Sequence, residues 1–328
     1  MPPVVTITTE ALFETPGPHL GVFKQAGFSV RYPKQAPPAS EADTIEAVGG
    51  SQAVLAGSEP YTRKVLESLP ALRVISRNGV GYDRIDLAAA TDHNVAVTIT
   101  PDANFEAVAE HTLALLLAVA RRVPMGDREL KAGLWKRGVP FRPLRGRTLG
   151  IVGLGRIGRA VARRAAAFGM RLLGHDIAAD ATVAASLGVE LTTCDDLLAR
   201  SEFVSLHAPH TPETTCLINA RSIAKMKPGA ILVNTSRGGL VDEAALYEAL
   251  AAGHLGGAGL DVFATEPPPA SKLLAFDNVV VSPHVAALDD QAVRDMSVGA
   301  AQNIVDLYQG RMPTACLVNC AVRDTWRW

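Results

Sequence analysis

The sequence predicts an α/β protein with two domains, each built on a doubly wound parallel sheet. The length of 328 residues exceeds that of one typical domain. Short β-branched runs alternate with helical stretches along most of the chain, as in sheets whose strands are joined by helical crossovers. A glycine-rich turn follows one of these runs at 148–155, and ligands bind at such strand ends in parallel sheets.

The first hundred residues contain five expected strands, which share β-branched composition and flanking turn residues: "VVTIT", "FSVRY", "AVLAG", "LRVISRNG" and "VAVTIT". The intervening stretches "YTRKVLESLP" and "IDLAAATDHN" have helical spacing. This alternation predicts a mostly parallel sheet covered by helices.

Residues 104–122, "NFEAVAEHTLALLLAVARR", are expected to form one long helix, apolar on most sides and therefore buried between domains or subunits. Its most apolar part, 112–120, is too short to span a bilayer. The next segment, "VPMGDRELKAGLWKRGVPFRPLRG", carries Trp135 and is expected to be an extended arm that packs on a partner chain. We therefore expect a homodimer.

A second series of strands is expected after this arm: "TLGIVGLG", "RLLGHD", "FVSLHAP", "AILVNTS", "GAGLDVF" and "VVVSPH". The stretch "DDQAVRDMSVGAAQNIVDLYQG" then reads as an amphipathic helix that ends at Gly310. We expect a cofactor domain at 102–287, inserted into a substrate-binding domain formed by 1–101 and 288–328, with the active-site cleft between the two.

Composition excludes several classes of partner and site. The net charge is −1, and no basic cluster with interleaved aromatic residues occurs, so neither nucleic acid nor a membrane is an expected partner. The N-terminus has no signal-peptide pattern. The cysteines, at Cys194, Cys216, Cys316 and Cys320, are scattered as in a reducing cytoplasm. Because the last pair has no second ligand pair nearby, we expect no metal site.

The strongest local motif is "TLGIVGLGRIGRAVARRAAAFGMRLLGHD" at 148–176. Gly153, Gly155 and Gly158 form G-x-G-x-x-G between an expected strand and an expected helix. These glycines permit a tight turn, close approach of a pyrophosphate, and close packing of helix on strand. The helix N-terminus offers free N–H groups to phosphates. Both domains are accordingly expected to be Rossmann-like.

Asp176 lies 23 residues after Gly153, at the end of the next expected strand. A carboxylate there can bind the adenosine ribose and would repel a 2′-phosphate, and the following "IAAD" supplies no arginine. NAD is therefore expected rather than NADP. Proteins that bind adenosyl-methionine share the turn geometry, so the motif alone leaves the cofactor open.

Three further segments, "HAPHTPET", "NTSRGGLVDE" and "SPHVA", follow expected strands, at the edge where ligands bind in such sheets. Arg237 lies in a small-residue turn, and its planar guanidinium suits a carboxylate. A surface arginine in a loop is the alternative. His284 is either an ordinary histidine at a strand end or an acid/base.

These segments, together with "GAGLDVFATEPPP" and "NVVVSPHVA", resemble the D-isomer-specific 2-hydroxyacid dehydrogenases over roughly 45–310, most closely the phosphoglycerate dehydrogenase and hydroxypyruvate reductase group. The resemblance implies an oxidoreductase that transfers a hydride between NAD(H) and C2 of a D-2-hydroxy or 2-oxo acid. It also implies that Arg237 binds the substrate carboxylate and carbonyl oxygen, that His284 exchanges a proton with the hydroxyl, and that Glu266 hydrogen-bonds His284.

The fingerprint and the resemblance together imply a cofactor set and a substrate loop. The cofactor set is Gly153, Gly155, Arg156, Ile157, Gly158, Asp176, His207, Pro209, Thr211, Thr235, Ser236, Asp261 and Ala286. The substrate loop, "RNGVGYD", contributes Arg77, Asn78, Val80 and Gly81. His210 is read as a loop residue near the cofactor.

Elementary chemistry supports the roles of His284 and Glu266. Hydride transfer to a carbonyl leaves an alkoxide, which needs a proton donor. An imidazole changes protonation near neutral pH, and a nearby carboxylate stabilises its protonated form. We therefore interpret His284 as the acid/base and Glu266 as the residue that tunes it.

Two residues argue against particular relatives. Formate dehydrogenases have glutamine at the position of Glu266, because formate has no proton for a base to take. Phosphite dehydrogenases have lysine at the position of Val80. Neither activity is expected.

The preferred substrate stays open. Arg77 can meet a substrate phosphate, but Ala56 stands where phosphoglycerate dehydrogenases often have a second arginine, and one cation holds a dianion less firmly than two. Ala107, where relatives usually have serine, and Phe105 alter the mouth of the expected cleft. Glyoxylate, hydroxypyruvate, 3-phosphoglycerate and larger 2-oxo acids all remain candidates, and no regulatory domain with serine feedback is expected.

A different class of function also remains. Some proteins of this fold are NAD-sensing corepressors that act through protein partners, and a fold alone does not exclude that role. The complete set of Arg237, Glu266 and His284 favours the enzyme.

Overall fold

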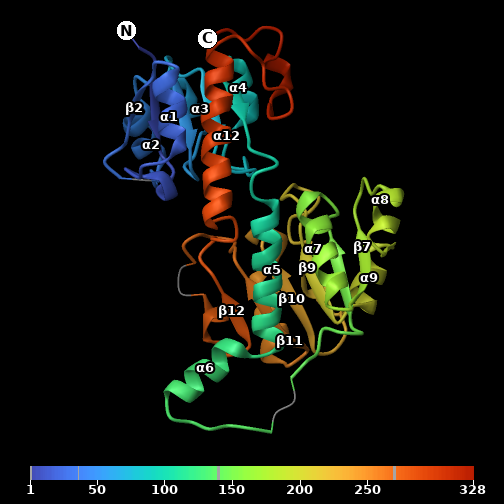
Figure 1. Ribbon diagram of the computed structural model, residues 1–328. Helices are drawn as coiled ribbons and strands as arrows, with labels where there is room; N and C mark the ends of the chain where they lie inside the picture. The colour runs from blue at the N-terminus through green and yellow to red at the C-terminus, as the bar shows by residue number, and fades with distance from the viewer. Residues whose placement is uncertain (1, 36, 139–140, 269–270) are drawn as a thin grey trace. The chain divides into compact units, whose positions relative to one another are not determined.

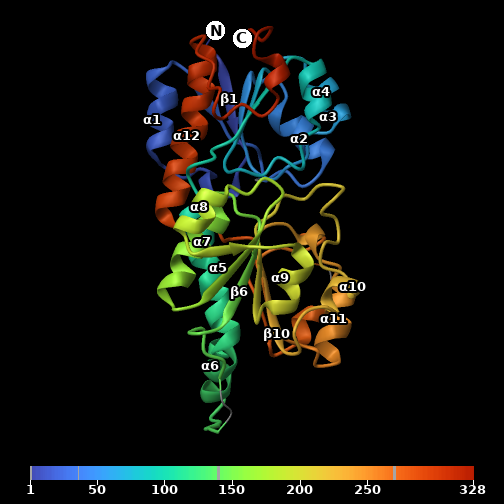
Figure 2. The same cartoon turned by 90° about the vertical axis from the view of Figure 1, so that its right-hand side faces the viewer.

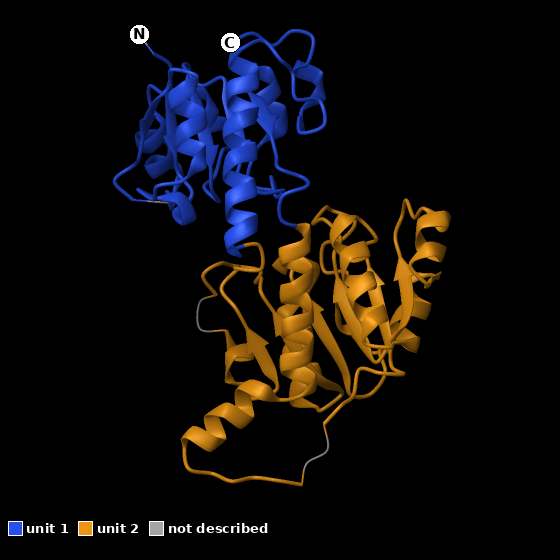
Figure 3. Cartoon of the chain, in the orientation of Figure 1, with its two compact units in different colours: residues 1–104, 288–328 blue, residues 105–287 orange. Residues whose placement is uncertain are grey.

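The computed structural model describes residues 2–35, 37–138, 141–268 and 271–328. Pro269, in the motif "GAGLDVFATEPPP", and residues 139–140 of the expected arm lie outside these ranges. The chain divides into two compact units, 1–104 with 288–328 and 105–287 (Figure 3). The prediction of two parallel-sheet α/β domains is confirmed.

Unit 1 is formed by 1–104 and 288–328 and contains a five-stranded parallel sheet in the order β2-β1-β3-β4-β5 (Figure 1). The strands are β1 (Val4–Ile7), β2 (Ser29–Arg31), β3 (Ala53–Ala56), β4 (Val74–Arg77) and β5 (Ala96–Thr98). The helices are α1 (Pro18–Gln25), α2 (Glu41–Val48), α3 (Arg63–Glu67), α4 (Leu87–Asp92) and α12 (Asp290–Tyr308). α1 and α12 pack together on one face, and α2, α3 and α4 lie on the other (Figure 2).

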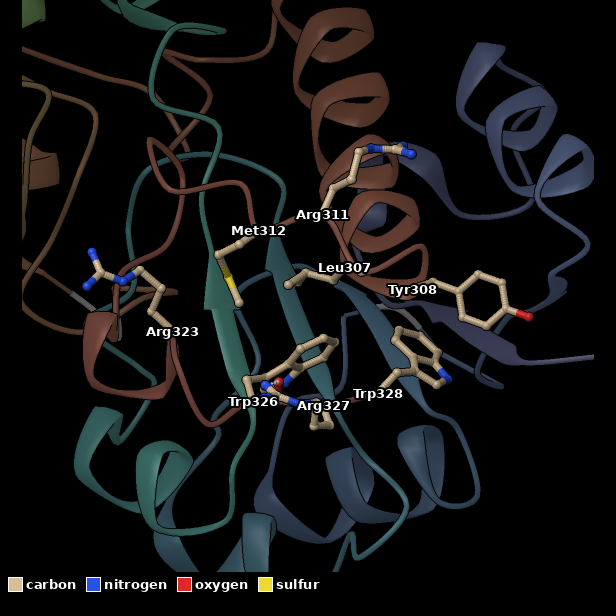
Figure 4. Close-up of a pocket in the computed structure, with 9 residues that line it drawn as sticks. Leu307, Tyr308, Arg311, Met312, Arg323, Trp326, Arg327 and Trp328 are labelled. Atoms are coloured by element: carbon tan, nitrogen blue, oxygen red, sulfur yellow. Dashed lines mark hydrogen bonds between the residues drawn. The ribbon is translucent and has the colours of Figure 1, made fainter.

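The C-terminal residues complete the core of unit 1. Asn319 accepts a hydrogen bond from Val97 N–H at 2.9 Å, and the Trp326 indole, only 5% exposed, donates to the Arg73 carbonyl at 3.1 Å. Trp326 and Trp328 form edge-to-face contacts beside a pocket of about 290 Å³ (Figure 4). The tail "RDTWRW" therefore covers the hydrophobic core of unit 1.

Unit 2, residues 105–287, contains a seven-stranded parallel sheet in the order β12-β11-β10-β9-β6-β7-β8. The strands are β6 (Thr148–Val152), β7 (Arg171–His175), β8 (Val189–Leu191), β9 (Phe203–Leu206), β10 (Ala230–Asn234), β11 (Leu255–Leu260) and β12 (Val279–Val281). This order extends the 3-2-1-4-5-6 arrangement of dinucleotide-binding sheets by one strand. The order reverses between β6 and β9, so the loops after these two strands flank the switch point, where such sheets bind ligands.

Helices cover both faces of the second sheet (Figure 2). They are α5 (Phe105–Ala120), α7 (Arg156–Ala167), α8 (Ala181–Ser186), α9 (Cys194–Arg200), α10 (Ala220–Ile223) and α11 (Glu243–Ala251). α5 packs against α7 and against β10, β11 and β12, so most of its apolar surface is buried within its own unit.

The expected arm differs from its prediction in one respect. Its first nine residues form α6 (Val123–Lys131) rather than extended chain, because a proline in the first turn and the Asp127–Lys131 ion pair favour a helix. α6 and residues 132–138 extend away from the sheet (Figure 1). Among the described helices, none combines the length and apolar character that a bilayer crossing requires.

Candidate active site

The glycine turn after β6 lies at the switch point of the sheet. Gly153 has φ +94°, and a Cβ there would come within 2.6 Å of the His207 carbonyl group, which follows β9. A Cβ on Gly158 would overlap the Gly153 carbonyl oxygen. The backbones of two strand-end loops and of α7 therefore approach each other as only glycine allows.

The N-terminus of α7 is available to an anion. Its N-cap, Gly155, makes no side-chain cap, and a Cβ there would meet no protein atom within 4 Å. The first helical residues are Arg156 and Ile157. Uncapped N–H groups and the partial positive charge of a helix N-terminus suit a phosphate, so this turn fits the pyrophosphate of a dinucleotide.

Asp176 supports the glycine turn from the end of β7. Its carboxylate accepts hydrogen bonds from the Leu154 N–H at 2.7 Å and the Ala178 N–H at 2.8 Å. The carboxylate is only partly buried, so it remains accessible to a ligand. Its negative charge beside the turn disfavours a further phosphate there.

The loop after β9 places its two histidines differently. The ring of His207 lies 2.8 Å from Ser205 Oγ, and burial lowers the pKa of His207 to about 3. That ring is therefore neutral near pH 7. His210 is exposed and packs against Gly239. Pro209 is exposed, and the Thr211 N–H donates to Thr214 Oγ1 at 2.8 Å.

The loop after β10 is shaped by Asn234, which is 1% exposed. Its side-chain oxygen accepts from the Ser236 N–H at 3.0 Å, and its amide donates to the Arg237 carbonyl at 2.9 Å. Gly238 lies against the Phe263 backbone so closely that a Cβ would overlap it. The turn that carries Arg237 is thereby held against the loop after β11.

Thr235 and Ser236 connect this turn to neighbouring elements. Thr235 is buried, with its hydroxyl 2.8 Å from that of Thr112 on α5. The Ser236 hydroxyl donates to the Ala208 carbonyl at 2.6 Å. The loops after β9 and β10 are thus joined at the edge that carries the glycine turn.

Glu266 and His284 form a hydrogen-bonded pair. Glu266 Oε2 lies 2.8 Å from His284 Nδ1, and Oε1 accepts from the Phe263 N–H at 3.0 Å. Partial burial alone would raise the pKa of the Glu266 carboxyl. The hydrogen bond and charge of His284, with help from the Phe263 N–H and Arg237, instead hold this pKa below its ordinary value.

This pairing fixes the roles of the two imidazole nitrogens. A carboxylate can only accept, so His284 Nδ1 carries the proton of that bond. Nε2 is left to exchange a proton with a substrate, and the side chain is 49% exposed. The Arg237 charge lies close enough to act on Glu266. A cation, a carboxylate and an imidazole thus lie together in unit 2.

Asp261 fixes the backbone around His284. Its carboxylate, with no exposed surface, accepts from Ser282 Oγ at 2.6 Å and from the Val285 and Ala286 N–H groups at 2.9 Å each. Its carbonyl accepts from the His284 N–H at 2.8 Å. His284 has φ +55°, a left-handed conformation that needs such support.

The expected substrate loop lies in unit 1, after β4. The Asn78 N–H donates to the Ala56 carbonyl, and Gly79, with φ +133°, exchanges hydrogen bonds with Thr100. Among the described residues, no backbone carbonyl accepts a hydrogen bond from the N–H group of Val80 or of Gly81. Two adjacent N–H groups suit a carboxylate.

The guanidinium of Arg77 folds back onto this loop. Nε donates to the Gly81 carbonyl at 2.6 Å, and one terminal nitrogen donates to the Ala56 carbonyl at 3.0 Å. Beside it, Glu59 is 2% exposed and accepts from the Tyr61 hydroxyl at 2.7 Å. Burial and Glu59 raise the pKa of Tyr61 well above its ordinary value, and Arg77 opposes them. Arg77 and the buried Glu59 thus act on the same tyrosine, Tyr61, with opposite sign.

Unit 2 holds the three catalytic candidates and all of the cofactor candidates, whereas the substrate loop lies in unit 1. Three contributors to the site were not predicted from the sequence: Asn234, Ser282, and His111 of α5, whose Nε2 lies 2.8 Å from Ser282 Oγ. Asn234 carried a usable signal, because asparagine commonly bonds the N–H two residues onward in a turn. Within the described ranges, no group of three or more His, Cys, Asp or Glu residues could hold a metal ion.

The chain is similar to several known proteins. Residues 113–286 match the family model described as "D-isomer specific 2-hydroxyacid dehydrogenase, NAD binding domain". The chain is 47% identical over 242 residues to D-3-phosphoglycerate dehydrogenase of Mycobacterium bovis, which covers 74% of this chain. The match covers 46% of that relative, so the chain spans about half of its length.

Two other proteins match over nearly the full chain. The glyoxylate reductase of Korarchaeum cryptofilum is 42% identical over 323 residues, covering 95% of both chains. The crystal structure of the TT0316 protein from Thermus thermophilus superimposes with a TM-score of 0.85 at 39% identity, covering 96% of this chain and 100% of that one.

The Glu266–His284 pair makes a prediction about titration. In the intact protein, the Glu266 carboxyl should titrate below its ordinary pKa, so the stability from its hydrogen bonds as a carboxylate is present near neutral pH and is lost as the pH falls through this lowered pKa. His284→Ala should raise that pKa, because it removes the hydrogen bond and charge that counteract the effect of burial on Glu266. Carbon-13 NMR of labelled glutamate can follow this group, and an unchanged midpoint in the variant would contradict the assignment.

Proposed function

Because this chain belongs to the D-isomer specific 2-hydroxyacid dehydrogenases and carries their NAD binding domain, we propose that it interconverts a D-2-hydroxy acid and the corresponding 2-oxo acid. The observation that carries this proposal is the His284 Nδ1 to Glu266 Oε2 hydrogen bond of 2.8 Å, with Arg237 close by. When bound, NAD(H) supplies or accepts the hydride. The protein must then bind the acid and move one proton.

Each catalytic candidate has a distinct part in this chemistry. Arg237 binds the substrate carboxylate and carbonyl oxygen, where its positive charge stabilises the developing alkoxide. His284 gives its Nε2 proton to that oxygen in reduction and takes it back in oxidation. Glu266 accepts the hydrogen bond of Nδ1 and so holds the ring with Nε2 available to the substrate.

We assign the cofactor to unit 2 and a substrate-binding role to unit 1, which follows the domain boundaries expected from the sequence. The glycine turn, the uncapped N-terminus of α7 and Asp176 suit a dinucleotide without a 2′-phosphate. In unit 1, the Val80 and Gly81 N–H groups suit a carboxylate. We also propose a cytoplasmic location, in keeping with Cys194, Cys216 and Cys320, which form no disulfide.

For the substrate, we propose a 2-oxo acid without phosphate, such as glyoxylate or hydroxypyruvate. Arg77 donates to the carbonyl groups of Ala56 and Gly81, and the buried Glu59 acts on the same tyrosine, Tyr61, as Arg77 does. A carboxylate next to this cation reduces its attraction for a dianion, and Ala56 adds no second cation.

We further propose a homodimer formed through α6 and residues 132–138. Exposed apolar side chains gather there, with Trp135 at 76%, Val123 at 60%, Leu130 at 57% and Leu134 at 47% exposure. Such a group of exposed apolar residues is typical of a protein interface. A second copy of the chain supplies a matching apolar surface.

The first prediction from the proposed function concerns turnover. Purified protein should consume NADH with hydroxypyruvate, faster than it consumes NADPH, and His284→Ala should lower kcat about 10²- to 10⁴-fold because the proton donor is lost. His93→Ala, which alters an exposed histidine of unit 1, is the control and should leave kcat unchanged. If NADH binds but no 2-oxo acid is reduced, a nucleotide-sensing binding protein becomes the better account.

The second prediction concerns the substrate phosphate. The kcat/KM for hydroxypyruvate should exceed that for its 3-phosphorylated form by about tenfold, since Glu59 offsets the Arg77 charge. Glu59→Gln should narrow this ratio, whereas Glu67→Gln, at an exposed position on α3, should leave it unchanged. A wild-type preference for the phosphorylated acid would reject the assignment.

The third prediction concerns assembly. Light scattering should give twice the chain mass of 34.6 kDa. The double change Leu134→Ser and Trp135→Ser should shift the mass toward the monomer at low concentration, because it removes apolar surface from the interface. Phe168→Ser, at an exposed site at the C-terminal end of α7, is the control. A monomeric wild type would refute the proposed dimer.

A further inference from the structure

His111 extends from α5 to the loop that carries His284. His111 Nε2 lies 2.8 Å from Ser282 Oγ and 3.5 Å from Asp261 Oδ1. Ser282 in turn lies 2.6 Å from the same Asp261 oxygen. The three side chains therefore form a chain of contacts from a helix to the end of a strand. None of the roles proposed above involves His111 or Ser282.

The chemistry of the groups fixes the direction of each hydrogen bond. The Asp261 carboxylate is an acceptor, so the Ser282 hydroxyl donates to it. The Ser282 oxygen then has only lone pairs to offer, and His111 Nε2 must donate to it. His111 therefore carries a proton on Nε2, and each group in the chain orients the next.

This chain of contacts ends at the backbone around His284. Asp261 accepts from three consecutive N–H groups, those of His284, Val285 and Ala286, through its carbonyl and its carboxylate. His284 has φ +55°, a conformation that persists only where its surroundings enforce it. The position of the Asp261 carboxylate thus determines where the imidazole of His284 lies.

We propose that His111 is a positioning residue for His284, acting through Ser282 and Asp261. The inference rests on the proposed function, in which His284 exchanges the proton. His111 does not contact the reacting atoms. It orients the Ser282 hydroxyl, which supports the Asp261 carboxylate in the geometry that binds the three N–H groups.

α5 is well suited to serve as the fixed reference for this chain. The residue after His111, Thr112, is fully buried and donates its hydroxyl to the Val108 carbonyl at 2.7 Å. Because that proton is committed, the Thr235 hydroxyl donates to Thr112 in their 2.8 Å contact. Thr235 lies two residues before Arg237. Adjacent residues of one buried helix therefore contact both loops that carry catalytic candidates, which fixes their separation.

The test compares four variants with the wild type in NADH consumption with hydroxypyruvate. His111→Leu and Ser282→Ala break the chain at successive points, and a double variant combines them. His111→Gln keeps an N–H donor at a similar reach. The matched control is His254→Leu, which removes another part-buried histidine of unit 2, one that contacts the Ile223 carbonyl near the amino end of β11.

If His111 positions His284, His111→Leu and Ser282→Ala should each lower kcat about 10- to 100-fold, because small misplacement of a catalytic group is costly. The isotope effect with 4-deuterated NADH should rise, because the misplacement slows the chemical step. His111→Gln should restore most of the rate. The double variant should be no slower than the slower single variant, because both changes break one chain.

Hydrogen exchange at the amides of 284–286 gives a readout independent of turnover. These amides should exchange at least about tenfold faster in His111→Leu than in His111→Gln or His254→Leu. Equal exchange and unchanged kcat in an active protein would overturn only the positioning role of His111. A wild type that reduces no 2-oxo acid would overturn the proposed function and this inference with it, and exchange would then report only on the loop.

Discussion

The burial of the Asp261 carboxylate is the constraint on which the proposed site depends. A carboxylate without exposed surface is costly unless donors surround it, and here Ser282, Val285 and Ala286 supply them. The loop after β12 must adopt one conformation to do so. That conformation holds His284 at a positive φ, with its ring against Glu266.

The parallel sheet of unit 2 explains how distant residues reach this constraint. Strands β6, β9, β10 and β11 all end at one edge, so the glycine turn, Arg237 and Asp261 gather there. Glycine, which has no Cβ, allows close approach at two points, Gly153 against the His207 carbonyl and Gly238 against the Phe263 backbone. Close backbone contacts at these two glycines therefore bring the loops of the site together.

Local patterns predicted most of the fold, but not the contacts between distant residues. The strand β6 and the glycine turn were predictable, because an apolar strand pattern and the spacing of glycines depend only on neighbouring residues. β8 was missed, since its three residues carry only one buried side chain. His111 was missed because it is a lone histidine on an apolar helix, and its partner Ser282 is 171 residues away. α6 was not predicted, because the prolines and glycines further along the arm indicated extended chain.

The division of unit 1 into two chain segments has a consequence for folding during synthesis. Unit 2 is continuous from 105 to 287, whereas the sheet of unit 1 is completed by α12 and the tail, through contacts such as Ser76 with Ala300 and Trp326 with Arg73. Domains generally fold as units as the chain leaves the ribosome. Unit 2 can therefore fold while the N-terminal strands still await α12, and the core of unit 1 is left open until that helix has been made.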